Sequence, residues 1–316
     1  MFQIKSKVLQ TGLACALAFA ACTAHAAGKP LKSLGITVSS LGNPYFVTLV
    51  NGAQAQAKTL NPNAKVTAVS ADYDLNKQFT QIDNFISAHV DMILIAAADP
   101  KAIEPAVKRA QAAGIPVIAI DVAAAGADAT VQTDNVKAGE LSCDYMAKKL
   151  NGKGNVIIES GAPGSSVVDR VNGCKAMLAQ HPGIKILSSD QDGKSSREGG
   201  LAAMQGYLTR FPKIDGVFTI NDPEAVGGDL AAKQFHRDNF MIVSVDGAPD
   251  IEAALKSNTL VQASASQNPW AMAQKAVTVG YDILNGRRPD NPMMLMEPTL
   301  VTRENVNAYK GWSSPH

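Results

Sequence analysis

A small set of polar and aromatic side chains stands at or just beyond the ends of the apolar runs in this sequence. The set combines carboxylates, amides, one guanidinium and two rings: Asn43, Tyr45, Phe46, Asp121, Arg170, Asn221, Asp246 and Gln267. Carboxylates accept hydrogen bonds, a guanidinium donates several in a fixed fork, and an amide does both. An aromatic face covers the apolar C–H side of a sugar ring or polyol chain. The set therefore predicts a site for a neutral molecule covered in hydroxyl groups.

The two rings are adjacent in "SSLGNPYF", residues 39–46, between an apolar run at 34–38 and a helical pattern at 47–60. Neighbouring residues on a helix point about 100 degrees apart, so both rings cannot simply face one core. We interpret Tyr45 and Phe46 as the lining of a ligand slot. The alternative is that both are ordinary core residues at the start of a helix.

The other members of the set also have ordinary structural interpretations. Asp121 and Asp246 are suitable helix N-caps, because aspartate is favoured at that position. Asn221, with proline two residues later, is a suitable cap as well. A single arginine such as Arg170 is often a solvated helix residue. The matching positions of the two aspartates favour binding, because both carboxylates would then face the same cleft.

Signatures of enzymes and cofactor sites are missing from the sequence. No G-x-G-x-x-G follows the first apolar run, and there is no P-loop, G-x-S-x-G elbow or H-E-x-x-H. The segment "DQDGKSSRE", 190–198, lacks the acidic spacing and closing glutamate of a calcium loop, so it is interpreted as a turn. We expect no catalytic residues, no cofactor and no metal site, and an exported enzyme is the least favoured class.

Strand and helix patterns alternate along the chain and would position these residues. Strands are predicted at 34–39, 65–70, 92–96, 116–120, 155–160, 185–189, 216–220, 241–245 and 260–264. Helices fill most of the gaps, for example 75–89, 103–113, 167–180 and 224–235. Continuous apolar runs such as "MILIA" and "VIAI" are typical of parallel strands that are covered on both faces. Repeated βαβ units of this kind predict an α/β protein with doubly wound parallel sheets.

The sequence also repeats its own organisation. "DMILIAAADP" begins at Asp91 and is followed by a strand ending in Asp121; "DGVFTINDP" begins at Asp215 and is followed by a strand ending in Asp246. The segment "VQTDNVKAG", 131–139, lies between the two units and suits a crossover. We infer two α/β lobes with a cleft between them, where ligands sit at the carboxyl ends of the strands.

Length and composition fit this organisation. The 316 residues are enough for two domains, and 46% of them are hydrophobic and 18% charged. The net charge is +1 and no basic block is present, so neither a nucleic-acid partner nor an anionic membrane is indicated.

Residues 1–26 have the pattern of a signal peptide: a basic start, an apolar stretch at 8–21 and an Ala24-His25-Ala26 cleavage site. We therefore expect a mature chain that begins at Ala27 and is exported to the periplasm. Lipoprotein anchoring at Cys22 is disfavoured, because Phe19 stands where leucine is usual.

Two cysteines remain after the expected cleavage, Cys143 and Cys174, and both fall on predicted helices. Export permits a disulfide between them. Two small buried side chains are the alternative, and the sequence leaves the choice open.

Over nearly the whole length after residue 26, the sequence resembles the periplasmic sugar-binding proteins of ABC transporters, in the ribose-binding branch related to the core of LacI-type regulators. The segments that carry the resemblance, in this order, are "SSLGNPYF", "GIPVIAIDV", "TDNVKAGELSCDYMAKKL", "GSSVVDRVNG", "FTINDPEAVGG", "VSVDGAPD" and "ASASQNPWAMA". Together they are highly specific, although each one alone is weak. A regulator is excluded, because the segment before the first strand has the pattern of a signal peptide and lacks that of a helix-turn-helix.

The resemblance implies a type I periplasmic binding protein, in which two Rossmann-like lobes are joined by three segments and close on the ligand. The implied lobes are 27–133 plus 268–291 and 134–267 plus 292–316, with hinge crossings near 133–134, 267–268 and 291–292. By motif position, Asn43 and the two rings contact the sugar from the first lobe, with Asp121 as the carboxylate that binds paired hydroxyls. Arg170, Asn221, Asp246 and Gln267 complete the implied site.

The resemblance also implies partners. We expect a sugar or polyol ligand, an ABC transporter permease that receives it, and a protein that works as a monomer. A ligand-loaded partner of a chemoreceptor or sensor kinase is the second candidate.

Several positions depart from the ribose-binding pattern. Val122 stands where these proteins carry arginine, Ala96 where asparagine is expected, and Val245 where an aromatic precedes "DG"; an aromatic expected near Ser195 is absent. Loss of an arginine and an amide removes donors from one side of the slot. We therefore expect another pentose, a hexose or a sugar alcohol in preference to ribose.

Overall fold

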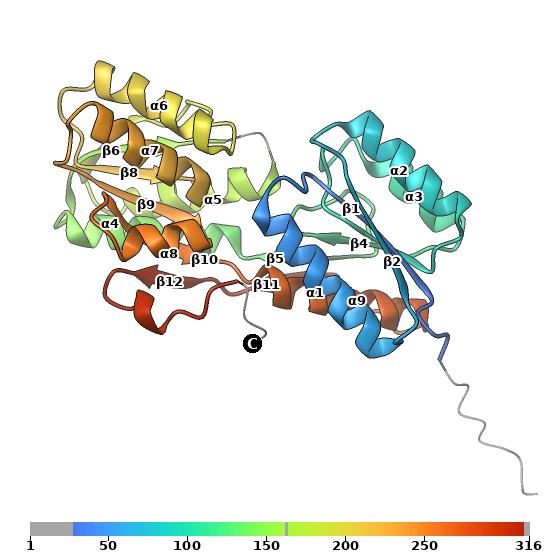
Figure 1. Ribbon diagram of the computed structural model, residues 1–316. Helices are drawn as coiled ribbons and strands as arrows, with labels where there is room; N and C mark the ends of the chain where they lie inside the picture. Colours follow the sequence, from blue (N-terminus) through green and yellow to red (C-terminus); the bar gives the residue numbers. More distant parts are fainter. Residues whose placement is uncertain (1–27, 162–163, 313–316) are drawn as a thin grey trace, which may run out of the picture.

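The strands form two separate sheets, one in each of two lobes that stand side by side (Figure 1). The computed structural model describes residues 28–161 and 164–312. The expected signal peptide, including Cys22, lies outside the described residues. The prediction of an α/β protein with two doubly wound, predominantly parallel sheets is confirmed.

The two sheets have the same strand order. In the first sheet the order is β11 (Met293–Met296), β5 (Ala129–Thr133), β4 (Val117–Ile120), β3 (Met92–Ile95), β1 (Ser33–Val38) and β2 (Lys65–Ser70). In the second it is β12 (Thr299–Thr302), β10 (Val261–Ser266), β9 (Met241–Asp246), β8 (Gly216–Thr219), β6 (Lys153–Glu159) and β7 (Gly183–Ser188). They differ at one edge, because β11 runs parallel to β5 whereas β12 runs antiparallel to β10.

The repeat seen in the sequence has a structural counterpart at the start of each central strand. An oxygen of Asp91 accepts hydrogen bonds from the backbone N–H groups of Lys32 and Ser33, at 2.7 and 2.8 Å. An oxygen of Asp215 accepts one from the N–H of Asn155, at 2.7 Å. In each lobe an aspartate ahead of the third strand thus holds the beginning of the first.

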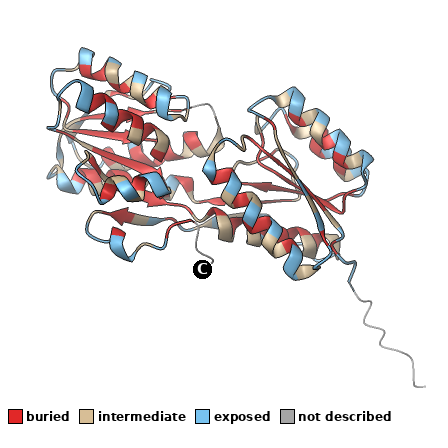
Figure 2. Cartoon of the chain, viewed as in Figure 1, coloured by how far each residue is buried: buried red, intermediate tan, exposed pale blue. Residues whose placement is uncertain are grey.

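Each sheet is covered by helices on both faces. The helices of the first lobe are α1 (Pro44–Leu60), α2 (Leu75–Ser87), α3 (Glu104–Ala112) and α9 (Pro269–Leu284); those of the second are α4 (Asn135–Lys149), α5 (Ser165–Leu178), α6 (Arg197–Arg210), α7 (Asp222–Gln234) and α8 (Pro249–Leu255). Side chains of β3 alternate between two core clusters, Met92 and Leu94 facing α1 and α9, Ile93 and Ile95 facing α2 and α3. Burial on both faces explains why such strands are apolar throughout (Figure 2).

Three connections join the sheets within the described residues, and they lie near the region where β5, β10, β11 and β12 meet (Figure 1). The first follows β5 at Asp134, and the second follows β10 at 267–268. The third falls between β11 and β12, at Glu297–Pro298. The expected crossing near 291–292 is therefore wrong in position, because residues 293–296 pair with β5 and still belong to the first lobe.

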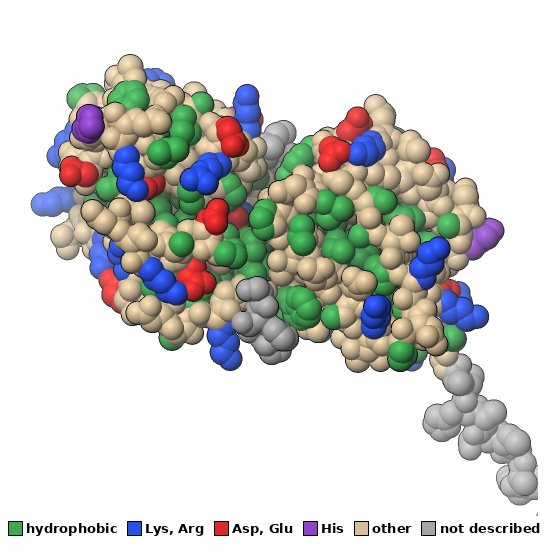
Figure 3. Space-filling model, viewed as in Figure 1, with side chains coloured by type: hydrophobic (Ala, Val, Ile, Leu, Met, Phe, Trp, Pro, Cys, Tyr) green, Lys and Arg blue, Asp and Glu red, His purple; other side chains and the backbone are tan. Residues whose placement is uncertain are grey.

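Within the described part of the chain, no helix is both long enough and apolar enough to span a bilayer. Figure 3 shows acidic and basic side chains interspersed on the face in view, in keeping with the net charge of +1.

Candidate functional site

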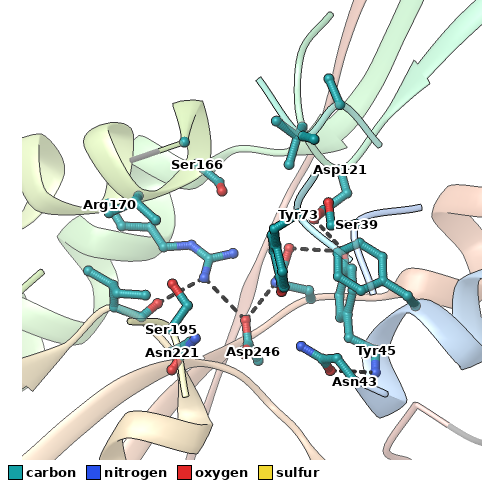
Figure 4. Close-up of a pocket in the computed structure, with 18 of the residues that line it drawn as sticks. Ser39, Asn43, Tyr45, Tyr73, Asp121, Ser166, Arg170, Ser195, Asn221 and Asp246 are labelled. Carbon is teal, nitrogen blue, oxygen red and sulfur yellow. Dashed lines mark hydrogen bonds and ion pairs between the residues drawn. The ribbon is translucent and has the colours of Figure 1, made fainter. Parts of the chain in front are cut away.

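A cavity of about 320 Å³ lies between the lobes, at the carboxyl ends of both sheets. Every one of the residues selected from the sequence lines it: Asn43, Tyr45, Phe46, Asp121, Arg170, Asn221, Asp246 and Gln267. Figure 4 shows Asp121 and Ser166 on one side of this space and Asn43 and Asn221 on the other, with Arg170 and Tyr45 facing each other across it. The fold thus brings together side chains that are far apart in the sequence, such as Tyr45 and Gln267, which are separated by 222 residues.

The first lobe contributes the paired rings through the start of α1. Asn43 caps this helix, its side-chain oxygen accepting a hydrogen bond from the N–H of Tyr45 at 2.9 Å, and Pro44 occupies the first turn. Tyr45 and Phe46 meet edge to face, with ring centroids 5.4 Å apart at 89°. Both rings are buried in the core of the first lobe and both line the cavity, so the two interpretations of the pair hold together.

Asp121 follows β4 and is not a helix N-cap, because the next element is another strand. Its backbone is in the left-handed region, with φ of +66°, and the residue is only 7% exposed. The phenol of Tyr45 donates a hydrogen bond to its Oδ1 at 2.8 Å. Burial raises the pKa of Asp121 to about 6, although Arg170 and the Tyr45 hydrogen bond oppose the shift. Burial also raises the pKa of Tyr45 well above its ordinary value, so the phenol remains a donor.

The second lobe places a buried ion pair opposite. Arg170 is 5% exposed, so it is not a solvated helix residue. Its Nη1 donates to the carbonyl of Ile220 at 2.8 Å and to Oδ1 of Asp246 at 3.2 Å, and its Nε donates to Asn135 at 2.8 Å. These contacts use Nε and Nη1, which makes Nη2 the part of the guanidinium that can reach a ligand.

Asp246 ends β9 and is not a helix N-cap either, since Ala248 occupies that position before α8. Its φ of +136° is unusual for a residue other than glycine. Burial raises the pKa of its carboxyl, and Arg170 opposes the shift. This carboxylate is paired with a cation, whereas Asp121 has a hydrogen bond to a phenol.

Gln267 joins the two halves of the site. Its Nε2 donates to Oδ1 of Asp246 at 2.7 Å, and its Oε1 accepts from Thr133 at 2.6 Å and lies 3.3 Å from the Tyr45 hydroxyl. A chain of contacts therefore runs from Asp121 through Tyr45 and Gln267 to Asp246 (Figure 4). It crosses from the first lobe to the second.

Asn221 is a helix cap as well as a cavity residue, so the structural interpretation of this position is confirmed. Its Oδ1 accepts from the N–H of Glu224 at 3.0 Å at the start of α7. Asn43 caps α1 in the same way, so the side-chain oxygens of both amides accept hydrogen bonds from helix N–H groups. What each side chain can offer a ligand is its NH2 group.

The helix that carries Arg170 is fixed against α4 by glycine. A methyl group at Gly139 of α4 would meet the carbonyl oxygen of Arg170 at 2.1 Å, and one at Gly173 of α5 would meet that of Val136 at 2.0 Å. Only glycine allows this close approach. The spacing of the two helices sets how far the guanidinium extends into the cavity.

A disulfide between Cys143 and Cys174 joins the same two helices, which resolves the choice that the sequence left open. Cys174 is one helical turn beyond Arg170, and Cys143 is two turns beyond Asn135. The cross-link therefore lies on the same helix faces as the Asn135–Arg170 hydrogen bond.

Further cavity residues were not identified from the sequence: Ser39, Tyr73, Ser166 and Ser195. Tyr73 follows β2 and has a φ of +59°. The residue is 56% exposed and lines the cavity. An aromatic directly after a strand, in "ADYD", was the available signal.

Trp312 supports the site from behind. Its indole N–H donates to the backbone carbonyl of Asp246 at 2.8 Å, and its ring lies edge to face on Tyr45 with centroids 5.3 Å apart. It thereby touches one residue of each lobe. No local pattern in the sequence marks this role.

The positions that depart from the ribose-binding pattern fall into two groups. Val122 and Ser195 line the cavity, so both departures alter its surface. Ala96 and Val245 are fully buried, and at the end of β3 it is Ala97 and Ala98 that line the cavity.

Among the described residues, no group of three or more histidine, cysteine, aspartate or glutamate side chains is placed to hold a metal ion. Two similar sheets, connections between them, and a polar cavity lined from both lobes define a two-lobed solute-binding protein. The chain belongs to the periplasmic binding protein family: residues 34–288 match the family described as periplasmic binding protein domain.

Known proteins similar to this chain are binding proteins. The ribose import binding protein of Bacillus subtilis (strain 168) is 34% identical over 81% of this chain and 83% of its own length. An ABC transporter solute-binding protein of Bacillus halodurans C-125, solved with bound myo-inositol, has 26% identity and a TM-score of 0.81, covering 90% of this chain and 99% of its own. The fructose-binding periplasmic domain of a hybrid two-component system has 25% identity and a TM-score of 0.80, covering 88% and 92%.

Proposed function

We propose that this protein captures a neutral monosaccharide or sugar alcohol in the cavity between its lobes and delivers it to the membrane permease of an ABC importer. The observation that carries the proposal is the pairing across one cavity of Asp121 with its aromatic neighbours and the Arg170–Asp246 pair. Carboxylates and a guanidinium in a buried slot bind hydroxyl groups strongly, at about 1.5–3 kcal/mol for each hydrogen bond to a charged group. Relatives that bind ribose and myo-inositol support the ligand class.

The internal contacts define what each side chain offers the ligand. Oδ2 of Asp121 accepts a hydroxyl proton, because its Oδ1 already accepts the Tyr45 hydroxyl. Oδ2 of Asp246 accepts only a long hydrogen bond, at 3.5 Å, from the N–H of Asp222 and has a further lone pair for a ligand hydroxyl. Nη2 of Arg170 and the NH2 groups of Asn43 and Asn221 donate to hydroxyl oxygens. The faces of Tyr45, Phe46 and Tyr73 cover the C–H surface of the ligand.

Ligand binding favours the closed arrangement of the lobes, because only that arrangement lets one molecule contact both. The connections at 133–134, 267–268 and 297–298 absorb the movement. We propose that the mature protein begins at Ala27, resides in the periplasm, works as a monomer and catalyses no reaction.

A thermal-shift screen of the chain from Ala27 onward tests the proposal. Pentoses, hexoses and sugar alcohols are compared with amino acids as controls. A specific ligand at a hundredfold excess over its dissociation constant stabilises the folded state by about 2.7 kcal/mol. A shift with a sugar or polyol, and recovery of that compound unchanged by NMR, is the expected result. A hit confined to amino acids contradicts the ligand class, and conversion of the compound contradicts the absence of catalysis.

A second candidate function is suggested by the similarity to the periplasmic domain of a hybrid two-component system. The loaded lobes would then dock on a chemoreceptor or sensor kinase. Ligand-dependent binding to a purified sensor domain, and none to the permease, would favour it.

A further inference from the structure

Two glutamates of the second lobe are buried without compensation for their charge. Glu159 ends β6 and Glu224 lies in the first turn of α7, and both residues are 0% exposed. In the described part of the chain, neither carboxylate oxygen of Glu159 has a hydrogen-bond partner, and Oε2 of Glu224 has none either. Burial without partners strongly disfavours an ionised carboxylate, so both groups cannot simply be charged.

The two carboxyl groups lie beside each other against Gly193. A methyl group at this position would meet Oε1 of Glu159 at 2.6 Å and Oε1 of Glu224 at 2.7 Å. Only glycine leaves room for both groups at such short range. Burial raises the pKa of Glu224 well above its ordinary value, and the charge of Glu159 beside it raises that pKa further.

The titratable groups around the pair add negative charge or none. The Tyr207 phenol of α6 is buried and faces both carboxyl groups. Asp192, in the loop after β7, faces Glu224, and Asp190 in the same loop faces Tyr207. Burial raises the pKa of Glu159 well above its ordinary value, and no cation of the described residues opposes this shift. Surroundings of this kind favour a neutral carboxylic acid.

Glu224 connects the pair to the cavity between the lobes. Its Oε1 accepts a hydrogen bond from the backbone N–H of Ser195 at 2.9 Å. Ser195 lines the cavity and belongs to the same loop as Gly193. The loop is thus attached to the pair at two points, through the contact of Gly193 and the hydrogen bond of Ser195.

We propose that Glu159 and Glu224 share one proton at neutral pH, and that the pair holds the loop with Ser195 in place at the cavity. One carboxyl group is then the donor and the other the acceptor of a hydrogen bond, which provides partners for two of the unpaired oxygens. The pair has one negative charge instead of two. Both glutamates are positioning residues, since neither lines the cavity. The inference goes beyond the proposed function, because it concerns the protein without a ligand.

Infrared spectroscopy of the unliganded protein tests the shared proton, because a protonated carboxyl group absorbs apart from a carboxylate. At pH 8, where Asp121 is ionised, the wild type should show the band of a protonated carboxyl group. The double variant Glu159→Gln/Glu224→Gln should lose intensity equal to one carboxylic acid. The matched control Glu198→Gln, at an exposed glutamate of α6, should leave the band unchanged.

Hydrogen exchange of the Ser195 amide, followed by NMR, tests the positioning role. Glu224→Ala removes the acceptor of this N–H group and should speed its exchange by at least about tenfold, the effect of losing a hydrogen bond to a charged group. Glu224→Gln keeps an oxygen in the same place and should restore most of the protection. The amide of Ala271 in the first lobe, which donates to Asn268, serves as an internal reference.

The results that would overturn this inference differ from those that count against the proposed function. An unchanged band in the folded double variant, or a metal ion bound at one per chain and lost in that variant, refutes the shared proton. Unchanged exchange of Ser195 in folded Glu224→Ala refutes the positioning role. Failure of every pentose, hexose and sugar alcohol to bind overturns the proposed function alone, because neither measurement uses a ligand. Circular dichroism and melting temperatures establish that the variants fold.

Discussion

The two lobes contribute opposite kinds of half-site to the same cavity. In the second lobe the charges are paired: Arg170 bonds to Asp246, Asn135 and the backbone, and a glycine contact and a disulfide fix its helix. In the first lobe Asp121 is buried with a phenol as its partner. A prearranged ion pair presents the same hydrogen-bonding groups to every ligand. Side chains with few fixed partners, such as Asp121, can adjust their hydrogen bonds to the ligand that is bound. We therefore expect the second lobe to supply most of the affinity and the first lobe to determine the specificity.

The largest effect should come from the paired side. Asp246→Asn leaves the guanidinium of Arg170 buried without its counter-charge, which costs about 2–5 kcal/mol and weakens binding by about thirtyfold to several thousandfold. Calorimetry measures the affinity, and circular dichroism checks the fold. Because the same loss affects the unliganded protein, the melting temperature should fall as well. Near-native affinity in a folded Asp246→Asn variant would contradict the site.

Asp121→Asn should weaken binding less, by about 10- to 100-fold, because it removes charge-assisted hydrogen bonds and strands no cation. Its effect on stability should have the opposite sign to that of Asp246→Asn. Burying an ionised carboxylate is unfavourable, so the amide should raise the melting temperature of the unliganded protein at pH 7. Equal destabilisation by both substitutions would remove the contrast between the lobes.

The pH dependence of binding should follow the first lobe. Hydroxyl donors favour the ionised form of Asp121, whose pKa is about 6 in the unliganded protein. Affinity should be constant above that value and fall by about tenfold for each pH unit below it, as a proton must leave before the ligand binds. Calorimetry between pH 4.5 and 8 measures this, in the wild type and in Asp121→Asn. A wild-type affinity that does not change with pH would contradict the prediction. An equal fall in Asp121→Asn would show that a group other than Asp121 controls the pH dependence.

The stability of the unliganded protein should move in the opposite sense over the same range. An acid whose pKa is raised in the folded state binds its proton more tightly in the folded than in the unfolded protein. The free energy of unfolding should therefore decrease as the pH rises from about 4 to about 6. Above about 6 this contribution is constant. Asp121→Asn should remove it.

The smallest effect on affinity should come from the disulfide. Replacing Cys143 and Cys174 together by serine should lower the free energy of unfolding by about 2–4 kcal/mol. Affinity should change only a few-fold, because the glycine contact and the Asn135–Arg170 hydrogen bond still position the guanidinium. Denaturant unfolding and calorimetry separate the two. A loss of affinity as large as that of Asp246→Asn would make the cross-link part of the binding machinery.

The strands that the sequence indicated include central ones with continuous apolar runs, such as β3, β4 and β8, which are buried on both faces, and also the partly exposed edge strands β2 and β7. Three strands were missed. β5 reads "ATVQT", which mixes polar and apolar residues, and β11 and β12 are edge strands with partly exposed side chains. A hinge crossing was predicted near Pro292, but this residue precedes β11, which pairs with β5 of the first sheet. The two strands are far apart in the sequence, so their pairing could not be seen from it. Pairing between distant edges leaves no local pattern.

The site residues were predictable for a similar reason. Strand ends can be found from local periodicity, and parallel sheets bring those ends together. Asn221 shows that such a position can also cap a helix, which spacing alone could not decide. The position of the Tyr73 ring depends on a positive φ, which the sequence does not reveal. Trp312 follows the last strand and packs behind the site through tertiary contacts, which have no local sequence pattern.

The position of Trp312 has a practical consequence. The chain has two tryptophans, and this one touches both Tyr45 and Asp246, whereas Trp270 begins α9. Indole emission responds to the polarity and hydrogen bonding around the ring. A ligand that enters beside Tyr45 should therefore change the intrinsic fluorescence of the protein, and a Trp270→Phe background would isolate the signal. The binding site then carries its own optical reporter, without an added dye.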